Sequence, residues 1–63
     1  MNIQAKVTWF DIRSGVGIAE DSNGNEYYLS NDCCPADLKH GEHIQGIPKS
    51  YGKTIGLVDV KRT

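Results

Sequence analysis

The chain has 63 residues, with eight acidic and seven basic side chains and a formal net charge of −1. A single domain of this length buries only about 60% of its unfolded surface, which leaves no room for a two-layer fold with a deep catalytic pocket. The near-neutral charge argues against a broad electrostatic grip on duplex DNA. Binding of single strands stays open, because stacking on aromatic rings supplies much of that energy.

The first half of the chain predicts three strands. Apolar and polar residues alternate over residues 3–8, which is the period of a half-buried strand, and Trp9-Phe10 continues it. Further strands are predicted over residues 15–20 and 26–30. Between them, Asn23-Gly24 favours a tight hairpin turn, because both residues tolerate positive φ.

The second half predicts an irregular segment and two more strands. In the irregular residues 31–41, Pro35 suits the first position of one helical turn that extends to Leu38. A fourth strand is predicted over residues 43–47, ended by Pro48. After a turn at residues 50–53, a fifth strand covers residues 54–61.

No segment shows a sustained apolar period of 3.6 residues, so a helical bundle is not expected. The elements predict one all-β domain over residues 1–63, a small closed barrel of five antiparallel strands, with an SH3-like barrel as the alternative fold at this length. The expected core consists of apolar side chains at alternate strand positions: Ala5, Val7, Leu29, Ile44, Val58 and Val60.

The sequence does not predict an enzyme. The carboxylates are scattered and stand mostly beside turns, and neither a nucleophile elbow nor a P-loop is present. Because no nucleophile, base and orienting group can be assembled, we expect no catalytic residue and no cofactor.

The cysteines and histidines have the chemistry of a zinc site but not its spacing. Cys33, Cys34, His40 and His43 lie close together in the chain. Paired zinc-binding cysteines are usually separated by about two to four residues, whereas adjacent residues of an extended chain point to opposite sides. We therefore predict no bound metal, with one cysteine packed inward and the other at the loop surface.

The compartment is inferred from the cysteines and the N-terminus. Adjacent Cα atoms are closer together than a normal disulfide requires, so Cys33 and Cys34 are expected to be reduced thiols. The first residues contain no apolar signal segment, and no stretch is long enough to cross a bilayer. We expect a cytoplasmic protein with no membrane contact.

Residues 7–18, VTWFDIRSGVGI, resemble the opening of the cold-shock domain, where V-K-W-F-N is followed after two residues by K-G-F-G-F-I. Five residues match that pattern at the same spacing: Val7, Trp9, Phe10, Gly15 and Gly17. Residues 26–31 stand where the family has D-V-F-V-H-F. Residues 38–44 and 57–60 are similar to its later L-x-x-G-Q-x-V and A-x-N-V segments, so the resemblance covers nearly the whole chain.

The resemblance implies an OB-type barrel whose second and third strands carry outward rings that stack on unpaired bases. Gly15 and Gly17 are then expected to point into the barrel. Trp9 is expected on the outer surface, although simple alternation places it on the core side with Val7, so the resemblance requires a twist or bulge between these two residues. Tyr27 and Leu29 are the expected inward residues of the third strand.

The chain also departs from the family pattern. Val16 and Ile18 replace an aromatic pair, Ser30 and Asn31 replace His and Phe, Ser14 replaces Lys, and Asp11 replaces Asn. By this resemblance the chain is identified as a divergent member whose aromatic face is partly lost. The predicted nucleic-acid-binding residues are the remaining rings, their aliphatic replacements and nearby polar groups: Lys6, Trp9, Phe10, Arg13, Val16, Ile18, Tyr28, Ser30, Tyr51 and Lys53.

The expected partner is single-stranded RNA or DNA, held by stacking. The alternative is a protein-interaction module that kept the barrel and reused the same face. In that case Val16 and Ile18 form an apolar patch with Trp9 and Tyr28, and such patches mark partner sites.

Overall fold

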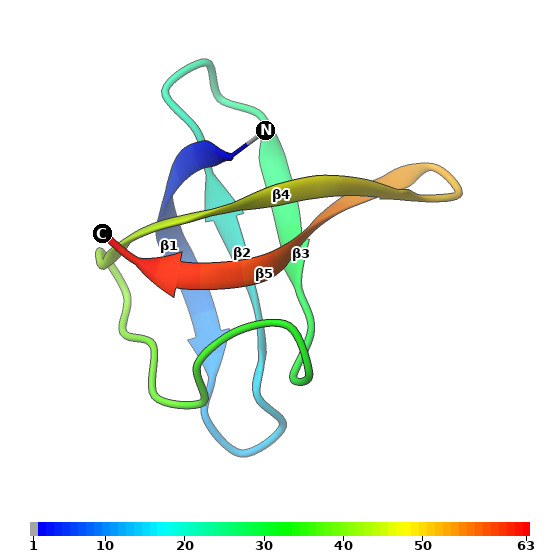
Figure 1. Ribbon diagram of the computed structural model, residues 1–63. Coiled ribbons are helices and arrows are strands. Elements are labelled where there is room, and N and C mark those ends of the chain that lie inside the picture. Colours follow the sequence, from blue (N-terminus) through cyan, green and yellow to red (C-terminus); the bar gives the residue numbers. More distant parts are fainter. Residues whose placement is uncertain (1) are drawn as a thin grey trace.

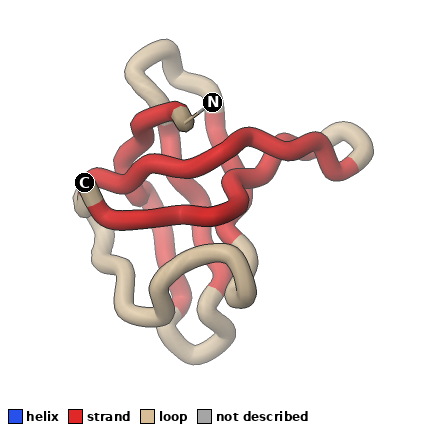
Figure 2. The backbone as a smooth tube through the Cα atoms, viewed as in Figure 1, coloured by secondary structure: helices blue, strands red, loops and turns tan. Residues whose placement is uncertain are grey.

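The computed structural model describes residues 2–63. Its strands are β1 (Ile3–Asp11), β2 (Val16–Glu20), β3 (Glu26–Leu29), β4 (His43–Tyr51) and β5 (Thr54–Arg62). They form a closed barrel in the order β1-β2-β3-β5-β4, and the described residues contain no helix (Figures 1 and 2). The predicted all-β barrel of five strands is confirmed. Across residues 2–63 there is no helix of the length and apolar character needed to cross a bilayer.

One strand pair differs from the predicted antiparallel arrangement. Four neighbouring pairs are antiparallel, but β3 and β5 run parallel, with Tyr28 beside Gly56 and Leu29 beside Leu57. Each strand reverses the direction of the one it is hydrogen-bonded to along β5-β4-β1-β2-β3, so β3 and β5 point the same way. Closing the barrel between them therefore produces a parallel pair.

Five of the six predicted core residues are buried, and Ala19, Leu38 and Leu57 join them without having been predicted. The buried apolar side chains are Ala5, Val7, Ala19, Leu29, Leu38, Ile44, Leu57 and Val60. Val58, which was predicted to be buried, is only partly so, and Leu57 takes its place.

A bulge in β5 explains this difference. Lys61 pairs with Gln45 and Val58 pairs with Ile47, so β5 contains one more residue than β4 between these pairs. Asp59 lies in that interval and has a positive φ of 53°. The extra residue breaks the alternation, so Leu57 and Val60 both face the core.

The segment between β3 and β4 closes one end of the barrel (Figure 1). The Leu38 side chain of this segment is buried in the core. Residues 36–37 form a turn and not a helix, so the predicted helical turn is wrong. Arg62 holds the segment to β5, with Nη2 2.6 Å from Asp37 Oδ1 and Nε 2.6 Å from Glu42 Oε2. Val60 N–H donates to Cys33 O at 2.9 Å. The barrel end is therefore closed by buried side chains and polar links rather than by a helix.

The two thiols are free, and they differ in environment. Cys34 packs against the core and donates to Ser30 O at 3.1 Å, and burial raises the pKa of its thiol. Cys33 is the partly exposed neighbour and lines a surface hollow. Both side chains are partly buried, so the predicted division holds for their contacts only: Cys34 packs against the core and Cys33 lines the hollow.

The β4–β5 hairpin is longer than predicted. β4 does not end at Pro48 but continues to Tyr51, and the hairpin projects from the barrel before turning at Gly52-Lys53 (Figure 1). β1 pairs with β4 only as far as Gly46. Beyond that residue β4 has one free edge, which tolerates a proline. Gly52 has a φ of 64°, as expected for glycine in the first position of a two-residue hairpin turn.

Candidate nucleic-acid interface

A β-bulge in β1 turns Trp9 to the outside of the barrel. Val7 pairs with Ala19 and Trp9 pairs with Ile18, so Thr8 is the extra residue. Thr8 Oγ1 donates to Ile18 O at 3.2 Å and so links the bulge to β2. Val7 is fully buried, whereas Trp9 is 51% exposed. The predicted outward position of Trp9, and the bulge that it requires, are both confirmed.

Trp9, Ile18 and Tyr28 form one row across three strands, which we call the outer row. Ile18 pairs with Trp9 on one side and with Tyr28 on the other, and directly paired residues project to the same face. Because neighbouring strands lie about 4.8 Å apart, the two ring-bearing positions are about 10 Å apart along the row. Tyr28 is 41% exposed, so both rings are accessible.

The hairpin extends the outer row by a third ring. Tyr28 pairs with Gly56, and a Cβ on Gly56 would lie 2.7 Å from Cε2 of Tyr51. The absence of a side chain at Gly56 therefore allows the Tyr51 ring to cover the β5 backbone. Lys49 Nζ lies 5.7 Å from the centre of this ring, within the range of a cation–π contact. Tyr51 is 45% exposed, so it is also accessible.

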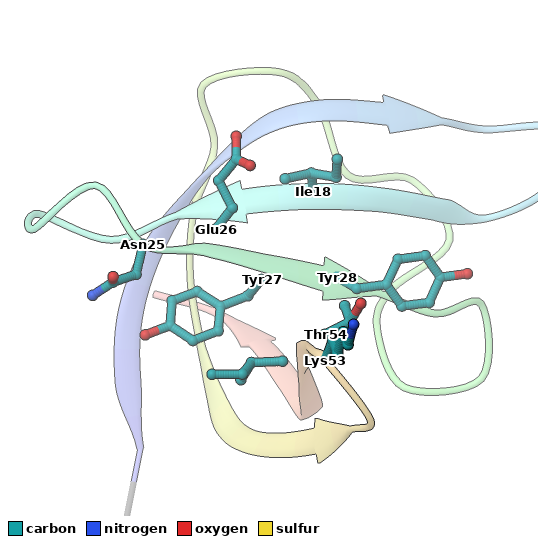
Figure 3. A pocket seen from close by; sticks show the side chains of 8 residues that line it. Ile18, Asn25, Glu26, Tyr27, Tyr28, Lys53 and Thr54 are labelled. Atoms are coloured by element: carbon teal, nitrogen blue, oxygen red, sulfur yellow. The ribbon is translucent and has the colours of Figure 1, made fainter.

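Two hollows adjoin Tyr28 and Thr54, and we name each after its carboxylate. The Glu26 hollow has a volume of about 510 Å³ and is lined by Ile18, Asn25, Glu26, Tyr27, Tyr28, Lys53, Thr54 and Ile55. It lies between β3 and the hairpin, and the rings of Tyr27 and Tyr28 leave β3 in different directions (Figure 3). The Asp32 hollow has a volume of about 650 Å³ and is lined by Tyr28, Ser30, Asp32, Cys33, Lys49, Tyr51, Thr54 and Val58. Both volumes lie in the range of small-ligand sites.

The interface carries charges of both signs. Asp32 Oδ1 accepts from Ser30 Oγ at 2.8 Å and from Cys33 Sγ at 3.4 Å, and these hydrogen bonds lower the pKa of the Asp32 carboxyl. Lys49 and Lys53 belong to the hairpin and are exposed. In the part of the chain that the structure describes, Arg62 is the only cation in an ion pair, so these lysines are available to an anionic ligand.

The remaining predicted site residues divide into two groups. Val16 and Ser30 lie close to the outer row. Val16 is half-buried at the start of β2, two residues before Ile18, and Ser30 lines the Asp32 hollow. Arg13 is exposed in the turn that joins β1 to β2, where its N–H donates to Asp11 Oδ1 at 3.0 Å.

Phe10 and Lys6 are not part of the outer row. Phe10 pairs with Gly17 and packs against the core, only partly exposed. Lys6 pairs with Glu20 and lines a separate hollow of about 420 Å³ that also contains His43. The structure therefore brings together Trp9, Ile18, Tyr28 and Tyr51, and it places these two residues elsewhere.

The two glycines of the motif have different tasks. Gly17 faces inward as predicted, because a Cβ there would lie 2.5 Å from Trp9 O and 2.7 Å from Phe10 Cδ1. Gly15 does not point into the barrel, which corrects the prediction. It has a φ of 76° in the turn after β1, where its N–H donates to Asp11 O at 2.7 Å, and a Cβ would lie 2.8 Å from Asn31 Cβ.

Sequence reasoning missed several residues of the interface: Asp32, Lys49, Thr54 and Ile55. Three of them belong to the hairpin, which was expected to be shorter. A two-residue Gly52-Lys53 turn was the available signal, since such turns join strands that continue to the turn itself. Asp32 had no local signal, because it reaches the interface through the path of the loop after β3.

Metal-binding side chains are not gathered in the described residues. Across residues 2–63, no group of three or more His, Cys, Asp or Glu side chains is placed to hold an ion. Cys33 lines the Asp32 hollow, whereas His43 lines the separate hollow beside Lys6. The interface accordingly offers flat rings, carboxylate oxygens and ammonium groups to a ligand.

Comparison of the chain with models of known protein families gives no match, and a search of curated proteins gives none either.

Proposed function

We propose that this chain is a binding module for single-stranded RNA or DNA that works in the manner of a cold-shock domain. The observation that carries the proposal is the outer row, in which Trp9 and Tyr28 are exposed on adjoining strands with Tyr51 beyond them. Stacking of a base on one such ring contributes about 1–3 kcal/mol, with little dependence on the base. Three accessible rings thus suit a short run of unpaired nucleotides.

The cations of the hairpin suit the backbone of such a strand. Lys49 and Lys53 stand beside Tyr51 and the Glu26 hollow respectively, and Arg13 stands at the β1–β2 turn. Each phosphate contact releases condensed counterions, so binding weakens as salt rises. With a net charge of −1, this chain is expected to depend more on stacking than on salt-sensitive attraction.

The proposed module does not bind duplex DNA tightly and does not catalyse a reaction. Bases of a duplex are already stacked on one another, so duplex DNA is expected to bind poorly. We propose no catalytic step and no cofactor, and a reducing cytoplasm as the compartment, where both free thiols are stable.

Titration of Trp9 fluorescence with a single-stranded 12-mer of mixed sequence tests the proposal. Trp9 is the only tryptophan, so a change in its emission reports on the outer row directly. We expect saturable quenching that weakens with added salt, and little quenching by the same sequence as a duplex. No quenching at low salt and high oligonucleotide concentration would rule out the proposal.

The second candidate is a protein-interaction module that uses the same face. It is favoured by Ile55, an exposed aliphatic side chain of the hairpin that lines the Glu26 hollow together with Ile18. This candidate takes the lead if oligonucleotides leave Trp9 emission unchanged while an apolar fluorescent dye binds the wild type and binds Ile55→Lys much less.

A further inference from the structure

The Asp32 hollow combines two rings with one fixed carboxylate. Tyr28 and Tyr51 line it, and both are exposed enough to carry a stacked base. Asp32 Oδ1 is held by two donors, Ser30 Oγ at 2.8 Å and Cys33 Sγ at 3.4 Å. The side chain is therefore oriented before any ligand arrives, and Oδ2 accepts no side-chain hydrogen bond that the structure records.

The two side chains that donate to Asp32 have no proton left for a ligand. The hydroxyl proton of Ser30 and the thiol proton of Cys33 are both directed at Asp32 Oδ1, so neither is free to meet a carbonyl of the ligand. An ionised carboxylate accepts hydrogen bonds and donates none. Hydrogen bonding to Ser30 and Cys33 keeps the pKa of this carboxyl low, so it is ionised at neutral pH.

The other polar groups of the hollow do not reverse this preference. The hydroxyls of Thr54, Tyr28 and Tyr51 both donate and accept, so they suit either kind of base edge. Lys49 Nζ stands over the Tyr51 ring at 5.7 Å, where it is suited to a phosphate of the strand whose base stacks below. Asp32 is therefore the group that distinguishes one base edge from another.

On the proposed function, we infer that the Asp32 hollow selects bases with an exocyclic amino group, with cytosine preferred over uracil. The amino group of cytosine donates to a carboxylate, which is a known readout of that base. Uracil has a carbonyl oxygen at the same position, which would meet the lone pairs of Asp32. The two bases have the same ring size, so stacking on Tyr28 and Tyr51 does not separate them.

The test compares deoxycytidine and deoxyuridine 12-mers, which share ring size and backbone and have no methyl group at position 5. Fluorescence anisotropy of end-labelled strands is measured at neutral pH and one salt concentration. We expect the cytidine strand to bind at least about fivefold more tightly, the lower end of what one good base-edge contact gives. A third strand, in which hydrogen replaces the amino group of each cytosine, should lose that advantage without any change to the protein.

Two protein variants assign the effect to Asp32. Asp32→Asn removes the charge and adds an N–H donor, so the ratio of the two affinities should fall close to one. Glu20→Gln removes one charge from a hollow outside the interface and should keep the wild-type ratio, which separates base reading from general electrostatics.

Each outcome decides between the proposals. Equal affinity of the wild type for the two strands overturns the base preference but leaves single-strand binding in place, as does a ratio that survives in Asp32→Asn. Binding of neither strand overturns the proposed function, and the base preference with it. If Asp32→Asn does not fold, the strand without the amino group still decides the matter on the wild type.

Discussion

The β2–β3 and β4–β5 hairpins both reverse through a glycine, but different interactions hold them. In the β2–β3 turn, Asp21 Oδ1 accepts from the N–H groups of Asn23 and Asn25, both at 2.9 Å, and Oδ2 accepts from Tyr27 Oη at 2.9 Å. Gly24, with a φ of 85°, provides the reversal there. One carboxylate thus holds the whole turn.

The tip of the β4–β5 hairpin has no such centre. From Ile47 to Ile55 its side chains are exposed, and it rests on the barrel through the Tyr51 ring over Gly56. One hairpin therefore uses its polar groups on its own turn, whereas the other leaves the Tyr51 ring and the lysines exposed. On the proposed function, the β2–β3 hairpin serves the fold and the β4–β5 hairpin contributes to binding.

The largest expected effect is on stability and separates the two hairpins. Leu29→Ala removes a fully buried side chain from β3 and should lower the free energy of unfolding by about 2–5 kcal/mol. Ile55→Ala removes a 45% exposed side chain from the hairpin and should change it by about 0.5 kcal/mol or less. Urea denaturation measures both. Equal losses would mean that the hairpin tip is as much a part of the fold as β3.

The next effect is on binding, and it should be as strong for a ring of the β4–β5 hairpin as for a ring of β1. Trp9→Ala and Tyr51→Ala should each weaken single-strand binding by about 1–3 kcal/mol, the contribution of one stacked base. The measurement is anisotropy of a labelled strand, since Trp9 is itself the fluorophore of the protein. Ile12→Ala, an exposed side chain outside the row, is the control. Unchanged binding by Tyr51→Ala would show that the β4–β5 hairpin is not part of the interface.

A smaller effect is expected when the Tyr51 ring is displaced instead of removed. Gly56→Ala places a Cβ where it would lie 2.7 Å from Cε2 of Tyr51, so the ring must shift. Binding should weaken, but by less than in Tyr51→Ala, and the double variant should bind no worse than Tyr51→Ala alone. Additive losses would show that Gly56 acts through something other than this ring.

The β2–β3 turn should be recognisable by its pH dependence. Hydrogen bonds, first of all from the Asn25 N–H, lower the pKa of Asp21 in the folded chain. A lowered folded-state pKa adds stability above the ordinary value of about 4, and this stability is lost as the pH falls through the folded value. The melting temperature of the wild type should exceed that of Asp21→Asn at pH 7, and the gap should narrow toward pH 3. A gap that stays constant would contradict the role of the ionised carboxylate.

The smallest effect belongs to a single hairpin charge. Lys53→Ala should reduce the slope of log affinity against log salt concentration by about 0.7, the value of one phosphate contact on a single strand. Titrations at several salt concentrations measure this slope. Lys6→Ala, which alters a lysine in the separate hollow, should leave it unchanged.

Those parts of the fold that depend on local patterns could be predicted from the sequence. Alternation located the strands, and the motif around Trp9 required the bulge that the structure contains. Asn23-Gly24 located the β2–β3 turn, but that turn spans residues 21–25 and only Gly24 in it has a positive φ. Leu57 was missed because the bulge depends on the positive φ of Asp59, and no residue type near it signals an extra position.

The rest of the interface depends on contacts between distant segments. The parallel β3–β5 pair joins residues that are far apart in the chain, and it is this pair that brings Tyr28 beside Gly56 and the Tyr51 ring. Asp32 reaches the same place through the loop after β3. Neither the β3–β5 pairing nor the path of this loop leaves a periodic pattern in the sequence. The individual rings could therefore be predicted, whereas their arrangement in space could not.

The β3–β5 pair also affects the order of folding. Hairpins of neighbouring strands form in about 1–10 μs, whereas pairings between distant segments must first overcome a large loss of chain entropy. Tyr28 and Tyr51 line one hollow only when this parallel pair has formed. A strand that bridges both rings would therefore bind only the fully closed barrel and would slow its opening, so the melting temperature should rise with ligand concentration.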